Sequence, residues 1–517
     1  MNEFFLTNFS AQDWLIVAIY LVGVFLAGVL AHRYISNVSD YMVGGRGSGT
    51  ALNIANYIAT GLCLVTIMYA SIESFSKGFS YMMIGLLCVP MGLVLGITGF
   101  VVRPLRSLQL LTIPEFFEKR FDKRTRVVAG AICALAGILN MGLFPKMGAT
   151  FITYATGLGA AGQVQMVNLV TSLMIVLVLI YTAMGGMVSV IVTDFIQFLI
   201  LGIGMGVGML VCLTHPDLGW TRIVTTLSEH RGEMAFNPFH PDSYGWLYMI
   251  WMAVVTVGAM VCWGPEASRA LTTKDEKTTM RTFLYSAPSA LGRVGIPAFW
   301  AIAAFCFYSQ HEEMARYFFP NGLSGSPVHA DQAMPLFMGK IVPVGLLGVL
   351  TAGMMAAFMS THSSYFLCWS SVIVRDVIGP FRTHPLSDKA QIRITRINIT
   401  WIAIFLLVWG IWYELPDSVW TYMAVTGNIY LSGSATILIG GIYWKRASRA
   451  GALAALGAGL LSIAGVFLDP IKQMFPHTLS WLTTEILGLG NYALCAVLFV
   501  VVSLLFPDKK KSVLQEN

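Results

Sequence analysis

The chain has 517 residues, of which 56% are hydrophobic and only 11% are charged. Soluble domains carry about 25% charged residues, so this composition excludes a soluble protein and indicates a polytopic membrane protein. The net charge of +6 does not predict a nucleic-acid partner, because the basic residues occur in alternate loops and not in one patch.

Apolar runs long enough to cross a bilayer, roughly 20 residues each, recur along the whole chain and predict about thirteen membrane spans. They occupy 13–32, 49–72, 79–102, 127–157, 164–184, 187–213, 244–264, 283–308, 341–374, 395–413, 418–443, 450–468 and 489–506. The longer connections at 215–243 and 309–340 are expected to hold short capping helices. The segment at 105–121 mixes apolar and basic residues, which is typical of an interfacial amphipathic helix.

Lysine and arginine are concentrated in every second loop. The rich loops are at 32–46, 103–126, 269–281, 382–396, 445–449 and 509–511, and the poor ones are near 222–231, 316 and 472. The positive-inside rule therefore predicts a cell-membrane protein with its N-terminus outside and its C-terminus in the cytoplasm.

The span at 341–374 holds an unusual group of hydroxyl residues: Ser360, Thr361, Ser363 and Ser364. Residues three and four apart share one face of a helix, so these side chains gather on a face with the small residue Ala357. Such hydroxyls can bond to the carbonyl one turn back or join neighbouring helices. They can also be oxygen ligands of a small hard cation, and the sequence leaves both readings open.

Four ionisable residues lie in or at the ends of spans, where such residues are candidates for function. Glu73 and Glu266 close the second and seventh spans and are expected near water, whereas Asp194 and Lys146 lie inside apolar runs. A buried ammonium group such as that of Lys146 needs an anionic partner, either a protein carboxylate or a solute.

The second span also mixes glycine, cysteine and hydroxyl residues in its centre. This composition is typical of an interrupted helix, whose freed carbonyls can coordinate an ion. It fits a polar face packed against another helix equally well. We find no motif of a metalloenzyme, serine hydrolase or kinase, and therefore expect no enzymatic activity.

Several segments together resemble the sodium/solute symporter family. They are GGRG (44–47), IATGLCLVT (58–66), LQLLTIPEFFEKRF (108–121), GGMVSVIVTDFIQ (185–197), SRALTTKD (268–275), AAFMSTHSS (356–364) and GGIYWKRASRAGA (440–452). The resemblance implies an all-α membrane protein with a LeuT-type fold that forms one transporter domain over 1–517. An extra helix at 13–32 would precede inverted repeats at 49–213 and 244–443. Two helices within 450–506 and a cytoplasmic tail at 507–517 would follow.

The resemblance also implies sodium as the coupling ion, with a main site and a second site. The main site would use the carbonyls of Ala59, Leu62 and Ala357 with the hydroxyls of Ser360 and Thr361. The second site would consist of Asp194, Ser360, Ser363 and Ser364.

The implied solute site lies at the membrane midplane. Its candidate residues are Gly61, Cys63, Thr66, Lys146, Trp263, Gly264 and Asn428. The cation Lys146 favours an anionic solute, such as sialic acid, another acidic sugar or a carboxylate. If a protein carboxylate pairs with Lys146, a neutral sugar or an amino acid fits equally well. A passive channel or a transporter-derived sensor is the alternative from another class. No nucleic-acid partner or obligate protein partner is expected.

Overall fold

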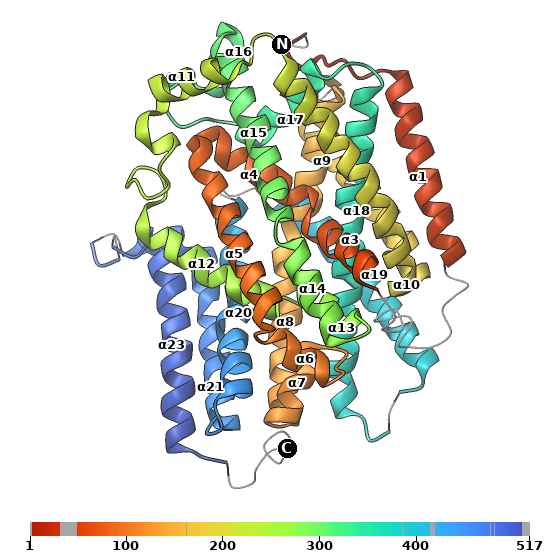
Figure 1. Ribbon diagram of the computed structural model, residues 1–517, viewed down its shortest axis with the longest axis vertical. Coiled ribbons are helices and arrows are strands. Elements are labelled where there is room, and N and C mark those ends of the chain that lie inside the picture. Colours follow the sequence, from red (N-terminus) through yellow and green to blue (C-terminus); the bar gives the residue numbers. More distant parts are fainter. Residues whose placement is uncertain are drawn as a thin grey trace.

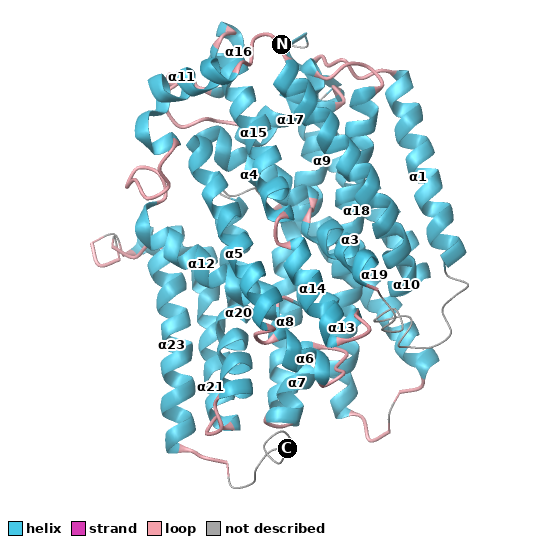
Figure 2. Ribbon diagram, in the orientation of Figure 1, coloured by secondary structure: helices cyan, strands magenta, loops and turns pink. Residues whose placement is uncertain are grey.

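The computed structural model describes residues 3–31, 49–161, 163–384, 386–413, 419–475, 477–479 and 481–508. The GGRG motif at 44–47 lies outside them. The described residues form helices and loops without a strand (Figure 2). Of these helices, twelve are long and apolar enough to cross a membrane. The stretch Leu64–Thr98 counts once among the twelve, although it contains two helices, Leu64–Lys77 and Met82–Thr98, which are separated at Gly78 with φ of 61°. The second and third predicted spans are therefore separate helices, as predicted.

The helices stand side by side along the long axis of the molecule (Figure 1). We call the end where α1 begins the upper face and the end where α23 finishes the lower face. The first half of the chain contains α1 (Ala11–Ala31), α3 (Thr50–Gly61), α4 (Leu64–Lys77), α5 (Met82–Thr98), α6 (Val102–Ser107), α7 (Ile113–Arg120), α8 (Lys123–Asn140), α9 (Phe144–Ala155), α10 (Gln163–Thr214) and α11 (Trp220–Arg231). Helix α10 comprises two predicted spans joined by a kink at Gly186, whose φ of 56° favours glycine.

The second half contains α12 (Gly245–Cys262), α13 (Gly264–Thr272), α14 (Glu276–Ser286), α15 (Ser289–Ser309), α16 (Glu312–Phe318), α17 (Ala330–Ile341), α18 (Leu346–Val372), α19 (Asp388–Trp412), α20 (Val419–Tyr443), α21 (Arg449–Gly459), α22 (Leu468–Met474) and α23 (Thr484–Leu505). A π-helical segment, Ile373–Ile378, extends α18. A 3-10 segment, Leu460–Phe467, joins α21 to α22.

Helix α18 lies at the centre of the bundle. In its most apolar stretch 89% of the residues are buried, compared with 28% in α1, which lies at the periphery. The second half of α10 approaches α18 closely, because Gly204 of α10 faces Gly353 of α18. A Cβ built on Gly204 would lie 3.5 Å from the Gly353 Cα and 3.2 Å from the Val349 carbonyl oxygen. Small residues let membrane helices approach in this way, so this contact positions the hydroxyl-bearing helix.

Replacing Gly204 by Leu is therefore expected to separate the two helices and lower the melting temperature of the purified protein by several degrees. Overpacking of a tight contact costs about 1–3 kcal/mol. The matched control is Gly202→Leu on the same helix, where an added Cβ meets nothing within 4 Å. A thermal unfolding assay in detergent compares them, and equal melting temperatures would contradict the proposed helix contact.

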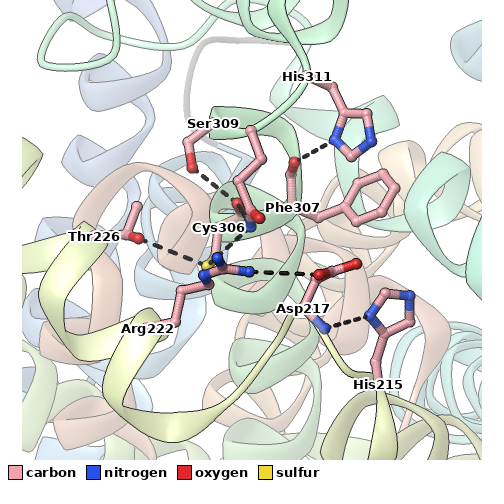
Figure 3. Close-up of polar contacts among 9 residues, drawn as sticks. His215, Asp217, Arg222, Thr226, Cys306, Phe307, Ser309 and His311 are labelled. Carbon is pink, nitrogen blue, oxygen red and sulfur yellow. Dashed lines mark hydrogen bonds and ion pairs between the residues drawn. The ribbon is translucent and has the colours of Figure 1, made fainter.

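Short helices cap the upper face, as expected for 215–243 and 309–340 (Figure 1). Helix α11 contacts α15 where Thr226 lies 3.7 Å from the Cys306 sulfur (Figure 3). Within the same connection, Arg222 of α11 pairs at 3.4 Å with Asp217 in the loop before this helix. These connections are thus folded over the bundle.

Two short helices, α6 and α7, bind the lower ends of three longer ones. Arg106 donates to the carbonyls of Thr273 and Lys274 after α13. Arg120 donates to the carbonyls of Gly441, Trp444 and Ala447 at the end of α20.

The third contact of this segment is a hydrogen bond of 2.9 Å that the hydroxyl of Thr112, the N-cap of α7, donates to the fully buried Asp376 carboxylate in the extension of α18. Arg126 of α8 pairs with the same carboxylate at 2.8 Å. The prediction of one continuous interfacial helix at 105–121 is wrong, because the segment forms two helices, α6 and α7. Phe116 and Phe117 are buried in the protein, so its apolar residues face the bundle.

Candidate functional site

The helix at the second predicted span is interrupted, which is one of the two structures that its composition fits. Helix α3 ends at Gly61 and α4 begins at Leu64, and Leu62 and Cys63 between them have non-helical backbone angles. The Cys63 sulfur accepts a hydrogen bond of 3.2 Å from the Thr66 backbone amide and thereby caps α4. The seventh span is interrupted in the same way at Trp263, which has ψ of 119° between α12 and α13.

A cavity of about 160 Å³ lies between these two interruptions. One water needs roughly 10–15 Å³ by the same measure, so the cavity has room for a small organic molecule. Much of its wall is aromatic: Tyr57, Tyr69, Tyr81, Trp263, Phe283, Tyr365 and Trp420. The Tyr69 and Trp420 rings lie 4.5 Å apart, and Trp263 donates to the Tyr365 hydroxyl at 2.9 Å. Such walls fit a solute with a ring or an apolar body.

Two charged side chains also line the cavity, Arg293 of α15 and Glu266 of α13. Arg293 lies near the middle of the 34-residue stretch Glu276–Ser309, so it is far from both ends of its span. Its guanidinium is 3.9 Å from the Glu266 carboxylate, and about a quarter of each side chain is exposed to the cavity. The other contacts of Arg293 are long, 3.5 Å to the Gly61 carbonyl and 3.9 Å to the Cys88 sulfur.

Four of the predicted solute-binding residues line this cavity: Gly61, Cys63, Thr66 and Trp263. Three others, Lys146, Gly264 and Asn428, are not part of its lining. The Lys146 ammonium donates to the Tyr413 carbonyl at 2.8 Å. Gly264 faces α18, because a Cβ there would lie 2.6 Å from the Cys368 sulfur. Asn428 is buried within α20.

The residues of the main predicted sodium site lie around the α3–α4 interruption and α18. Ser360 donates to the Ala59 carbonyl at 3.0 Å, and Thr361 donates to the Ala357 carbonyl at 3.0 Å. Leu62 is the C-cap residue of α3. Hydroxyl and carbonyl oxygens of the predicted set thus converge from two helices, which is the ligand chemistry that a small monovalent cation needs.

The residues of the second predicted site are buried on α10 and α18, two helices that pack against each other. Asp194, Ser360, Ser363 and Ser364 are each at most 2% exposed. The Ser363 hydroxyl donates to the Ser360 carbonyl at 3.0 Å. The Tyr181 hydroxyl of α10 donates to the carbonyl of Met359, the residue before Ser360, at 2.8 Å, so the two helices are in direct contact at this position.

Replacing Asp194 by Asn is expected to reduce the number of sodium ions transported per solute. The substitution removes the charge that would offset a second cation, while it keeps the size of the side chain. Sodium and solute fluxes measured together in proteoliposomes give the ratio. An unchanged ratio at normal expression would mean that Asp194 is structural.

Arg293 is the site residue that the prediction missed. The signal was present, since an arginine within the apolar run 283–308 is as exceptional as Lys146. Glu266 was expected near water at the end of its span, but it faces the cavity because α13 begins directly after the interruption.

Comparison with known proteins identifies the family of this chain. A model described as the sodium:solute symporter family matches residues 41–459. The sodium/sialic acid symporter SiaT of Proteus mirabilis is 25% identical over 472 residues, covering 89% of this chain and 90% of that protein. The osmoregulated proline transporter OpuE of Bacillus subtilis is 26% identical over 472 residues, covering 86% of this chain and 87% of that protein.

A solved structure, described as a substrate-bound outward-open state of a Na+-coupled sialic acid symporter, superposes with a TM-score of 0.78 at 20% identity. The match covers 97% of this chain and 100% of that one, and confirms the predicted LeuT-type helical fold. Since the family model spans most of the chain, the protein belongs to the sodium:solute symporter family, whose members are multi-pass membrane transporters and not enzymes.

Proposed function

We propose that this symporter couples sodium entry to the import of a small organic anion, either an acidic sugar such as sialic acid or another carboxylate. The observation that carries the solute class is Arg293. A guanidinium has five N–H donors in a planar fork that matches a carboxylate. Among the residues that the structure describes, its Nε atom has no hydrogen-bond partner, and the two hydrogen bonds of the guanidinium measure 3.5 and 3.9 Å. A solute carboxylate would give this fork two short charge-assisted bonds.

The similarity to SiaT supports an acidic sugar, and the aromatic wall of the cavity suits a sugar ring. OpuE is equally similar in sequence, so the solute class rests on the charge in the cavity and not on the relatives. The alternative of an amino acid is supported by Glu266, which offers an anionic group beside Arg293.

The main and the second predicted sodium sites, which share Ser360, support two sodium ions per transport cycle, one at each site. The loop charges support an orientation with the upper face outside and the lower face, where α6 and α7 lie, in the cytoplasm. In this orientation both oxygen-rich groups lie on the cytoplasmic half of α18.

Uptake into proteoliposomes tests the function. We expect a sodium gradient to drive accumulation of sialic acid or a short carboxylate, whereas galactose should be excluded. A thermal-shift series with and without sodium identifies the tightest solute, because a ligand raises stability by mass action. Uptake of galactose, with no carboxylate transported, would overturn the proposal of an anionic solute.

A further inference from the structure

The charged pair in the cavity has an open geometry. The closest nitrogen–oxygen distance between Arg293 and Glu266 is 3.9 Å, which is longer than a hydrogen bond. In a closed bidentate pair these distances are about 2.7–2.9 Å, and both groups then satisfy each other. Here the donors of Arg293 and the acceptor oxygens of Glu266 remain side by side and accessible from the cavity.

The two side chains come from elements that fix their separation. Glu266 lies in the first turn of α13, directly after the interruption at Trp263, and Arg293 lies in the first turns of α15. Gly61 leaves room for the guanidinium, because a Cβ on Gly61 would lie 3.1 Å from the Arg293 Nη1. The guanidinium is therefore held against the α3–α4 interruption, next to the carboxylate.

Adjacent donors and acceptors of opposite charge fit a ligand with the reverse arrangement. The anionic part of such a ligand binds the guanidinium, and a neighbouring hydroxyl or ammonium group donates to the Glu266 carboxylate. A carboxylate that carries the donor on its adjacent carbon has this arrangement. A plain carboxylate would leave Glu266 without a donor in a partly desolvated site, which is unfavourable.

We propose that Glu266 and Arg293 together select a carboxylate with a hydrogen-bond donor on the adjacent carbon, as in 2-hydroxy and 2-amino acids. The inference rests on the proposed import of a carboxylate and adds a second recognition element. Arg293 provides the affinity for the anion, and Glu266 discriminates between solutes that have the donor and solutes that lack it.

Paired competitors test this inference in proteoliposomes that take up a labelled carboxylate. The pairs are lactate with propionate, alanine with propionate, and N-acetylneuraminate with its 2-deoxy analogue. The wild-type protein is expected to prefer the donor-bearing member by about 10- to 100-fold, as for a hydrogen bond to a charged group. Glu266→Ala should remove the preference while inhibition by the plain carboxylate persists.

Glu73→Gln is the matched control, because the Glu73 carboxylate bonds to the Tyr244 hydroxyl and does not line the cavity. It should keep the wild-type preference. Glu266→Asp keeps the charge and should retain part of the preference for donor-bearing carboxylates. This variant serves as the test if Glu266→Ala does not fold.

The outcomes separate this inference from the function on which it rests. If no carboxylate inhibits the wild-type protein, the proposed function fails. If carboxylates inhibit but both members of each pair do so equally, only the selection by Glu266 fails. A preference that persists in folded Glu266→Ala would also overturn it.

Discussion

Replacing Arg293 by Gln is expected to lower the transport of an anionic solute by about 30-fold or more. The substitution removes a guanidinium that faces the cavity near the middle of its span. Loss of one partner in a desolvated charged hydrogen bond costs about 2–5 kcal/mol, which corresponds to this factor or more. The initial rate of sodium-driven uptake, corrected for the amount of folded protein, measures the effect.

Two variants decide what Arg293 contributes. Arg293→Lys keeps the charge but not the planar fork and should recover only part of the transport. Lys146→Gln removes another cation, which the sequence predicted to bind the solute and which lies outside the cavity lining. We expect it to keep the preference for anions. If Lys146→Gln loses that preference and Arg293→Gln keeps it, the solute binds Lys146 instead.

Replacing Ser360 or Thr361 by Ala is expected to raise the sodium concentration for half-maximal uptake by about tenfold. Each change removes one hydroxyl from the oxygen group that α3 and α18 form, and Ser360 belongs to both predicted sites. Loss of one such contact costs about 1–2 kcal/mol.

Ser370→Ala is the control on the same helix, since Ser370 is fully buried and outside both oxygen groups. Its sodium dependence should match that of the wild-type protein. Wild-type sodium dependence in both Ser360→Ala and Thr361→Ala would rule out the main site as proposed.

Periodicity and composition were sufficient for the architecture. Apolar runs located the spans, and the glycine, cysteine and hydroxyl residues between Gly61 and Thr66 were consistent with an interruption of the second one. These signals are local, because bilayer thickness and backbone hydrogen bonding act on each segment separately. The four hydroxyl-bearing residues on α18 could also be recognised from the sequence, because they are close together in the chain, between 360 and 364.

The solute site was only partly predictable, because its composition depends on which way each helix turns. Lys146 and Arg293 are both cations within apolar runs, and nothing in the sequence distinguishes the one that reaches the cavity. Gly264 directly follows Trp263, yet Trp263 lines the cavity and Gly264 faces Cys368. Such differences follow from tertiary packing and not from residue type.

The arginine contacts of α6 and α7 imply an asymmetry in how the lower face tolerates mutation. Arg106 and Arg120 donate to backbone carbonyls, which every amino acid provides. Substitutions at Thr273, Lys274, Trp444 and Ala447 therefore leave these acceptors in place. Gly441 is the exception, because a Cβ there would lie 3.3 Å from the Arg120 Cγ. Any change at Arg106 or Arg120 instead removes two or three bonds at once and leaves buried helix ends without donors. The arginine donors of these contacts are thus expected to tolerate substitution less than the residues that provide the carbonyl acceptors.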